Sequence, residues 1–445
     1  MIKALLPGVM LLLSLTPGAV HAEPVLMISV DGLRPGDVID AERRGLKIPN
    51  LRRFLAEGSY ASGVVGVLPT VTYPSHTTLI TGVSPDQHGV VNNTTFDPKG
   101  INQTGWYWYA RDIRVPTLWD AAAKAGLSVA NVFWPVSVGA SSIRWNLPQY
   151  WRTGHPDDLN LMKALATPGL VDRLETDVGK PYVQGIDETV EADENRGAFA
   201  VQLIKDQKPD FATVYLTGLD HQQHESGPDT PEAHAVLERI DAIIGTLIAT
   251  ERAMHPDAVI ALVSDHGFAP TTVEVDFFRA FIDEKLITLD ENGKVADWLA
   301  MPWPSGGSVA IALAKPDDSA VLARVSALLD RLKADPDMHI ASVLRKSEIA
   351  AVHGNPQASF YVEMAPGAMS GGFKGPTADM VRPSRSKGMH GYFPASAVMR
   401  STFMIMGPRI PKGHDFGEID MRAIAPTLAR IMNVPFPSAA VPALE

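Results

Sequence analysis

Three short apolar runs organise the chain. They span residues 25–30, 211–216 and 258–263 and consist mostly of aliphatic and aromatic side chains. Runs of this length without polar alternation are typical of strands that are buried on both faces, as in a parallel sheet. Two further strands are predicted at 127–133 and 402–406.

Helical patterns alternate with these strands. Helices are predicted at 116–125, 191–205, 231–249 and 420–432, and another at 48–57 with Asn50 as its cap. This alternation predicts an α/β fold, in which helices flank a central, mostly parallel sheet. Between 271 and 387 the pattern weakens to one apolar run and one helix, so we expect an inserted smaller region there.

Composition limits the class of partner. The 445-residue chain has a formal net charge of −11 and contains no cysteine. An acidic chain is poorly suited to sequence-independent binding of long nucleic acid, which relies on clustered Lys and Arg. The absence of cysteine excludes disulfides and a lipid-modified cysteine anchor. A small phosphoester remains compatible with this composition.

Residues 1–22 have the pattern of a secretory signal peptide. Lys3 gives a positive start, residues 4–15 are mostly apolar, and Val20-His21-Ala22 matches a small-residue cleavage pattern. The apolar stretch is shorter than the about 20 residues needed to span a bilayer, so no membrane anchor is expected. We therefore expect a catalytic domain at 23–445 in the periplasm, with full secretion as the alternative.

Each of the three main apolar runs is followed by an acidic residue. Asp31 follows the first, Asp220 the second and Asp265 the third. The carboxyl ends of parallel strands commonly share one crevice. Three carboxylates in one crevice would repel each other strongly unless cations lay among them, so a metal cluster is predicted. Taken alone, Asp31 is better explained as a turn residue than as a metal ligand.

Histidines accompany two of these acids. Asp220 and His224 are four positions apart, so both side chains can face one cation if the segment is helical. His266 directly follows Asp265, which adds a second possible ligand after the same strand. A surface cluster of acids and histidines is the alternative explanation.

The threonine- and proline-rich stretch at 68–82 contains the predicted nucleophile, Thr72. A threonine hydroxyl attacks poorly at neutral pH unless a base or a metal activates it. We expect a helix to begin within 77–81, so that its N-terminus and the Tyr73 N–H lie near the Thr72 oxygen. An ordinary loop is the alternative.

Four motifs occur in an order that resembles one known family. They are Thr72-Tyr73-Pro74-Ser75-His76, the segment from Asp220 to His224, Ser264-Asp265-His266-Gly267 and Gly388-Met389-His390-Gly391-Tyr392. The chain resembles the nucleotide pyrophosphatase/phosphodiesterase family of the alkaline phosphatase superfamily from about residue 25 to residue 428. The resemblance implies an alkaline-phosphatase-like layered fold, with 271–387 forming part of the substrate rim.

The resemblance also implies a site with two zinc ions. One ion would be held by Asp220, His224 and His390, and the other by Asp31, Asp265, His266 and the Thr72 oxygen. Asn93 would donate a hydrogen bond to a nonbridging phosphoryl oxygen, and Tyr73 would contact the leaving group. Ser75 departs from the family, which commonly has an asparagine at that position.

The expected activity is zinc-dependent hydrolysis of phosphodiester or pyrophosphate bonds through a phosphothreonine intermediate. Nucleotides are the favoured substrates, and dinucleotides, sugar nucleotides or lysophospholipid-like headgroups stay open. The alternatives are a phosphomonoesterase or phosphonate hydrolase with the same metals, and a non-catalytic metal-binding protein. An arylsulfatase is disfavoured because the chain has neither a cysteine nor a Ser-x-Pro-x-Arg run. The sequence predicts no oligomeric state.

Overall fold

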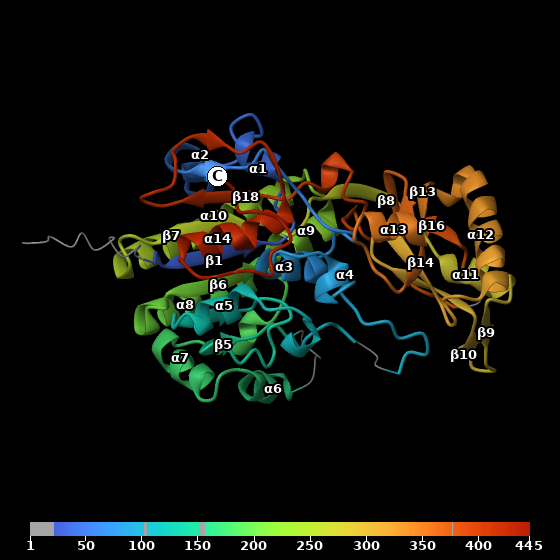
Figure 1. Cartoon of the computed structure of the whole chain (residues 1–445), viewed down its shortest axis with the longest axis horizontal. Helices are drawn as coiled ribbons and strands as arrows, with labels where there is room; N and C mark the ends of the chain where they lie inside the picture. The colour runs from blue at the N-terminus through green and yellow to red at the C-terminus, as the bar shows by residue number, and fades with distance from the viewer. Residues whose placement is uncertain (1–21, 102–104, 151–155, 376) are drawn as a thin grey trace, which may run out of the picture.

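The structure, a computed structural model, describes residues 22–445 except 102–104, 151–155 and 376. All but the last residue of the predicted signal peptide therefore lies outside the described residues. The described chain forms a larger part around one large sheet and a smaller part beside it (Figure 1). None of the helices in these residues combines the length and the apolar character needed to cross a bilayer.

An eight-stranded sheet forms the centre of the larger part. Its order is β19 (His414–Asp415), β2 (Ser59–Tyr60), β18 (Phe403–Met406), β7 (Val259–Val263), β1 (Val25–Val30), β6 (Phe211–Leu216), β4 (Val129–Val132) and β5 (Trp145–Leu147). The five strands from β7 to β5 are parallel, and β18 runs antiparallel to β7. Every residue of β1, β6 and β7 is buried, as their apolar runs predict.

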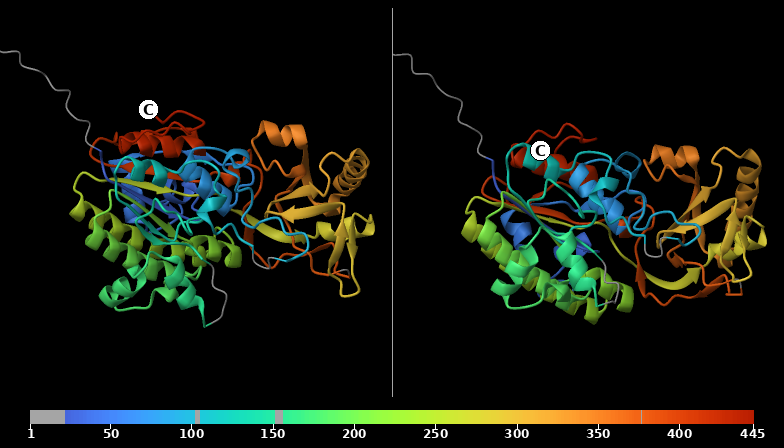
Figure 2. Two further views of the ribbon diagram at one scale, coloured as in Figure 1. Left: turned by 60° about the horizontal axis from the view of Figure 1, so that its bottom comes forward. Right: turned by 90° about the horizontal axis from the view of Figure 1, so that it is seen from below.

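Helices cover both faces of this sheet (Figure 2). On one face α8 packs along α10, and α2 and α9 also contact α10. On the other face α14 packs against α3 and α5. The predicted α/β class, with a mostly parallel sheet flanked by helices, is confirmed. The larger part contains α1 (Pro35–Ile39), α2 (Pro49–Glu57), α3 (Thr72–Thr81), α4 (Pro85–His88), α5 (Leu118–Lys124), α6 (Asp158–Leu165), α7 (Leu170–Val178), α8 (Val190–Gln207), α9 (Gly218–Ser226), α10 (Pro231–Met254) and α14 (Ile424–Ile431).

The smaller part is formed by the chain between β7 and β18. Its four-stranded antiparallel sheet has the order β11 (Ala300–Pro304), β12 (Ser308–Leu313), β14 (Ala358–Met364) and β13 (Ile340–Arg345). A second sheet joins β15 (Gly367–Ser370), β8 (Ala269–Val275) and β16 (Val381–Pro383), and β17 (Gly388–Met389) also pairs with β8. The remaining elements are α11 (Phe277–Asp283), α12 (Ser319–Ala334), α13 (Lys346–Ala351) and the hairpin of β9 (Ile287–Leu289) and β10 (Val295–Trp298). A further strand pair, β3 (Gly63–Val65) with β20 (Glu418–Asp420), lies outside this segment.

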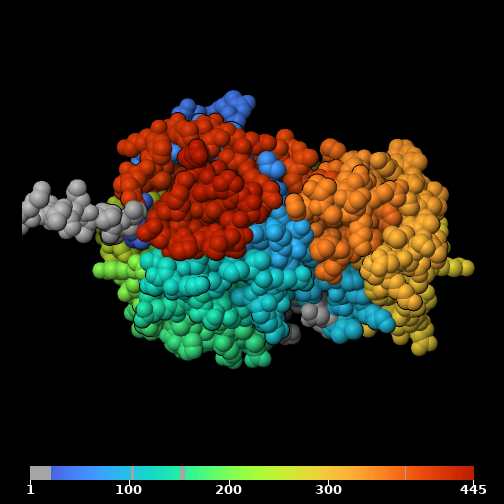
Figure 3. Space-filling model, viewed as in Figure 1, coloured from blue at the N-terminus to red at the C-terminus, as the bar shows by residue number. Residues whose placement is uncertain are grey.

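The two parts lie side by side, with residues of the blue to cyan segment exposed between them (Figure 3). Each has its own cluster of buried apolar side chains. The Thr70 hydroxyl, just before α3, donates a hydrogen bond of 2.6 Å to the Tyr392 carbonyl, which follows β17. The boundaries 23–445 and 271–387 stay predictions.

The predicted start of the nucleophile helix is wrong. Helix α3 begins at Thr72 itself, after Val71 in an extended conformation, and ends at Gly82, whose φ is +67°. Pro74 is tolerated because the first turn of a helix has no internal partner for the N–H that proline lacks. The Thr77 hydroxyl donates to the Tyr73 carbonyl at 2.8 Å, which satisfies one of the polar groups of this fully buried helix.

The predicted cap of α2 is also wrong. Pro49 is its first residue, Ile48 precedes it, and no side chain of α2 caps it. Instead, the carboxylate of Asp241, in α10, accepts hydrogen bonds from the backbone N–H groups of Asn50 at 3.2 Å and Leu51 at 2.7 Å. This cap comes from a residue far away in the sequence, which local reading does not detect.

Candidate metal centre and nucleophile

The predicted acidic residues meet at the carboxyl edge of the large sheet. Asp31 follows β1 directly, and Asp265 lies two residues after β7. Asp220 belongs to α9, which follows β6. Figure 1 shows α9 and α3 at the end of the sheet that faces the smaller part. The register of β1 with β6 and β7 aligns these strand ends.

The first group of donor atoms comes from Asp220, His224 and His390, whose ligand atoms all lie within 4.8 Å of one another. His224 Nε2 is 3.3 Å from Asp220 Oδ2, and His390 Nε2 is 3.7 Å from Asp220 Oδ1. His224 Nδ1 lies 2.9 Å from the Gly388 carbonyl oxygen, and His390 Nδ1 lies 3.2 Å from the Thr70 carbonyl oxygen. Because a carbonyl only accepts, each Nδ1 carries the proton and each Nε2 lone pair is free for a metal.

The second group comes from Asp31, Asp220 and His266, also within 4.8 Å. His266 Nε2 is 3.2 Å from Asp31 Oδ1 and 3.1 Å from Asp265 Oδ2, so Asp265 adjoins this group as well. His266 Nδ1 faces the Gly267 carbonyl at 3.1 Å. Asp220 therefore lies in both groups, whereas the sequence assigned it to one.

The residues present fit a metal ion. Within the described residues, Asp31 Oδ1, Asp220 Oδ1 and Asp265 Oδ2 are buried and accept no hydrogen bond. Buried carboxylate oxygens without a partner are costly, and cations among them would compensate. Burial, and next the charges of Asp220 and Asp265, raises the pKa of Asp31 well above its usual value. Carboxylate and imidazole donors are the N and O ligands that zinc accepts.

The electrostatics of His390 also suit a ligand. Burial, and next the neighbouring His266, lowers the pKa of His390 to about 3. The two rings stack with centroids 3.6 Å apart and an angle of 7° between their planes. His390 is therefore neutral at pH 7, as a metal-binding imidazole must be.

Thr72 lies beside the second group. Its Oγ1 is 3.5 Å from His266 Nε2, and the residue is 7% exposed. The helix start is held by His76, whose Nδ1 is 2.9 Å from the Thr72 carbonyl and whose Nε2 is 2.8 Å from Ser29 Oγ. The structure thus brings the predicted nucleophile next to the predicted ligands.

Asn93 is held next to the nucleophile by the main chain. The Tyr73 N–H donates a 2.9 Å hydrogen bond to Asn93 Oδ1. The contact of the Tyr73 N–H with a bound anion stays a prediction. With Oδ1 engaged in this way, the NH2 group of Asn93 is the half of the amide left to donate to a substrate.

Tyr73 itself is enclosed by other aromatic rings. Its side chain is fully buried, with ring centroids 5.2 Å from Trp106 and 6.4 Å from Trp108. Trp108 in turn contacts Tyr150 at 5.3 Å. The contact of Tyr73 with a leaving group stays a prediction. Unlike Tyr73, Trp106 and Trp108 are partly exposed.

Two supporting groups were missed by the sequence analysis. The Tyr215 hydroxyl of β6 donates to Asp31 Oδ2. The other oxygen, Asp31 Oδ1, accepts no hydrogen bond from the described residues and can face a cation held by the second group. The Gly32 N–H donates to Asp265 Oδ1 at 3.2 Å. A tyrosine inside a buried strand needs a partner for its hydroxyl, so Tyr215 carried a signal that was overlooked.

A family model described as type I phosphodiesterase / nucleotide pyrophosphatase matches residues 25–393. Among curated proteins, human ectonucleotide pyrophosphatase/phosphodiesterase family member 1 is 25% identical over 262 residues, which cover 56% of this chain and 24% of that protein. An uncharacterised pyrophosphatase/phosphodiesterase of Schizosaccharomyces pombe is 26% identical over 298 residues, covering 65% of this chain and 52% of that protein. The matches thus span about a quarter to a half of these relatives' lengths.

Solved structures share the fold. Human ectonucleotide pyrophosphatase/phosphodiesterase 5 has a TM-score of 0.65 at 18% identity and covers 95% of this chain and 96% of its own. The murine protein, as an inactive threonine-to-alanine variant in complex with AMP, has the same score and coverage at 19% identity. At this identity the likeness shows an alkaline-phosphatase-like fold. Because the family model covers most of the chain, this protein belongs to the type I phosphodiesterase / nucleotide pyrophosphatase family.

Proposed function

We propose that this protein hydrolyses phosphodiester or pyrophosphate bonds of small substrates, nucleotides among them, through a phosphothreonine intermediate. The observation that carries the proposal is the Thr72 hydroxyl beside two donor groups that share Asp220. The names of the relatives support the reaction class, and the AMP complex of the murine relative supports nucleotides as substrates.

Two zinc ions are part of the proposal. Asp220, His224 and His390 would hold one, and Asp31, Asp265, His266 and the Thr72 oxygen the other, with Asp220 adjoining this second group as well. When bound, zinc lowers the pKa of an attacking oxygen and offsets charge on phosphoryl oxygens. The buried, unpartnered oxygens of three aspartates support cations at this position.

The chain's own residues divide the chemistry between them. The Thr72 hydroxyl loses its proton to water, and its oxygen attacks phosphorus while the bond to the leaving group breaks and the leaving oxygen takes up a proton from water. The phosphoryl group, with the one ester substituent that a diester retains, is then carried by Thr72. Water then hydrolyses this ester and restores the hydroxyl. Asn93 orients a nonbridging oxygen through its NH2 group, and His76 keeps the start of α3 in place.

Asn93→Ala should lower kcat/KM for a diester about a hundredfold, because it removes a donor that is pre-aligned with the developing charge. Zinc content should be unchanged, since Asn93 belongs to neither donor group. Steady-state kinetics and metal analysis of the purified variant check both statements. Thr95→Ala is the matched control, because it removes a polar side chain of the same loop whose hydroxyl donates to the Gly105 carbonyl. Equal losses in both variants would contradict this role of Asn93.

The substrate class gives a further test. We expect bis-p-nitrophenyl phosphate to be turned over faster than p-nitrophenyl phosphate. A neutral amide suits a diester with one negative charge, whereas monoesters carry more charge and are usually met by Arg or Lys. Release of p-nitrophenol at matched concentrations measures the ratio. A dominant monoesterase activity would favour the phosphomonoesterase alternative instead.

We further propose a periplasmic location, with a signal peptide at 1–22 and a catalytic domain at 23–445 whose region 271–387 borders the substrate. The positive start, apolar core and small-residue pattern of the first residues support the first part. The position of His390 directly after β17, at the end of that region, supports the second.

A further inference from the structure

A buried ion pair lies behind the donor groups. Asp193 and Arg196 are one helical turn apart in α8, and both are 0% exposed. The Arg196 guanidinium donates to Asp193 Oδ1 and lies over the Phe133 ring, 4.3 Å from its centroid. A buried pair of this kind seldom adds net stability compared with apolar residues, so its contacts call for another explanation.

Asp193 caps a helix other than its own. Its Oδ1 accepts the Thr217 N–H at 2.9 Å, and its Oδ2 accepts the Gly218 N–H at 2.7 Å. These N–H groups open α9, whose own N-cap residue, Thr217, makes no capping bond to it. The approach is close enough to require glycine, since a Cβ on Gly218 would lie 2.8 Å from Asp193 Oδ2. A carboxylate at a helix N-terminus also complements the helix dipole.

Arg196 holds this cap in position. It donates to the Thr217 hydroxyl at 2.5 Å and to the carbonyls of Gly185 and Asp187 at 2.6 and 2.7 Å. The guanidinium thus joins the carboxylate, the start of α9 and the loop before α8 into one network. Burial raises the pKa of the Asp193 carboxyl, and the charge of Arg196 opposes this rise.

Helix α9 carries two members of the first donor group. Asp220 is its third residue, and His224 follows one turn later. Any shift or fraying of the N-terminus of α9 would move Asp220 away from His390 and from the second group, because Asp220 belongs to both. The network around Asp193 therefore bears on ligand geometry as well as on folding.

We propose that Asp193, held by Arg196, is a positioning residue that sets the metal affinity of the donor groups through the N-terminus of α9. This inference rests on the proposed function. The substitution that tests it is Asp193→Asn, which keeps the shape but replaces one accepting oxygen by an NH2 group. Residues that support metal ligands typically change metal affinity by about 10–100-fold when they are replaced.

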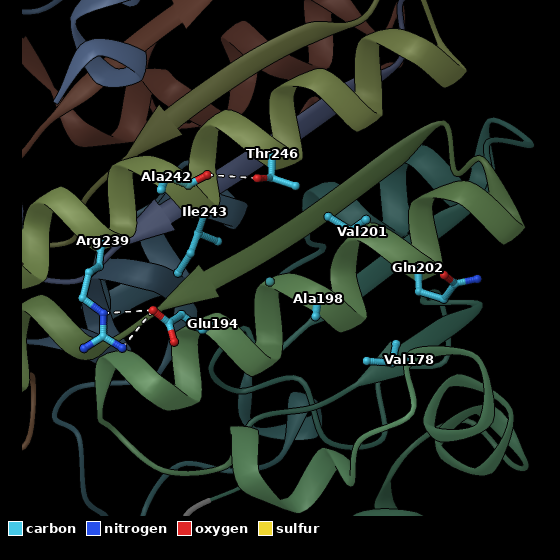
Figure 4. Close-up of a pocket in the computed structure, with 10 residues that line it drawn as sticks. Val178, Glu194, Ala198, Val201, Gln202, Arg239, Ala242, Ile243 and Thr246 are labelled. Atoms are coloured by element: carbon cyan, nitrogen blue, oxygen red, sulfur yellow. Dashed lines mark hydrogen bonds and ion pairs between the residues drawn. The ribbon is translucent and has the colours of Figure 1, made fainter.

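The exposed side of α8 offers a matched control. Glu194, next in sequence to Asp193, accepts a 2.9 Å hydrogen bond from Arg239 Nε of α10 (Figure 4). This pair borders a cavity of about 500 Å3 that is lined by none of the candidate site residues. Glu194→Gln removes a charge from the same helix without touching α9.

The experiment measures zinc binding to the full chain by competition with a chromophoric chelator, without substrate, at a temperature where circular dichroism shows each variant folded. Asp193→Asn should weaken binding of at least one ion about tenfold or more, and Glu194→Gln should not. The cobalt absorption spectrum of Asp193→Asn should also change, which a merely less stable protein with intact ligands would not show.

Two outcomes overturn the inference. Wild-type zinc affinity and an unchanged cobalt spectrum in folded Asp193→Asn would refute it and leave the proposed function intact. Absence of zinc binding in the wild type would refute both. If Asp193→Asn does not fold, Thr217→Ala replaces it, because it removes the hydroxyl that accepts from Arg196 and donates to the Glu188 carbonyl while leaving the Asp193 carboxylate intact. This variant should weaken zinc binding in the same direction by a smaller factor, and unchanged affinity there overturns the inference.

Discussion

Thr72→Ala should lower the turnover of bis-p-nitrophenyl phosphate by about a thousandfold or more while zinc stays bound. Removing the nucleophile of a covalent mechanism leaves only the part of catalysis that binding and charge stabilisation provide. The metal should stay because both donor groups, Asp220 with His224 and His390 and Asp31 with Asp220 and His266, come together without Thr72. Turnover and zinc content of the same preparation measure the two effects.

Two further variants separate the hydroxyl from the helix that carries it. Thr72→Ser keeps a hydroxyl on the same backbone atom and should retain a large share of turnover. Thr77→Ala removes a buried hydroxyl one turn later in α3, where it bonds to the Tyr73 carbonyl, and should leave turnover within a few-fold. Rapid acid quenching followed by mass spectrometry should detect a phosphoryl group on Thr72 of the wild type.

The result for Thr72→Ala discriminates between classes of protein. If diester turnover were unchanged, the chain would be a metal-binding protein whose apparent activity has another source. If turnover fell only a few-fold with zinc bound, water would attack the substrate directly and the phosphothreonine intermediate would be wrong.

Asp220→Ala should remove both zinc ions and lower diester turnover at least about a hundredfold. The expectation follows from the shared position of Asp220, whose carboxylate oxygens lie within 4.8 Å of donors in both groups. His224 belongs to one group only. His224→Ala should therefore keep the ion of the other group and lose less zinc than Asp220→Ala.

Metal analysis after dialysis against metal-free buffer measures the difference. Glu225→Ala is the matched control, because Glu225 is exposed on α9 next to His224 and is not part of either group. It should retain wild-type zinc content. Equal zinc loss in Asp220→Ala and His224→Ala would contradict a shared ligand and favour two sites with separate aspartates, as the sequence assigned them.

Several features of this protein follow from local sequence. The runs that form β1 and β6 lack polar alternation, which favours buried strands, and their predicted bounds match the structure. The crevice at the strand ends follows from parallel topology, which brings the residues after each strand to one edge. The four-residue spacing of Asp220 and His224 needs only one helical turn to bring both donors together.

Other features depended on contacts between distant segments. Asp241 caps α2 and Asp193 caps α9, and in both cases the partner lies in another helix. The sequence cannot reveal such caps because the capping side chain has no fixed spacing from the N–H groups that it accepts.

The chain by itself determined which residue types could bind a cation and that strand ends would collect them, because both depend on side-chain chemistry and local backbone geometry. Only the tertiary structure decided that Asp220 adjoins both donor groups, that Tyr215 holds Asp31, and that Tyr73 lies buried under tryptophans. These arrangements arise from the packing of α9, β6 and the loop around Trp106, and such packing is set by the whole fold rather than by the residues nearby in sequence.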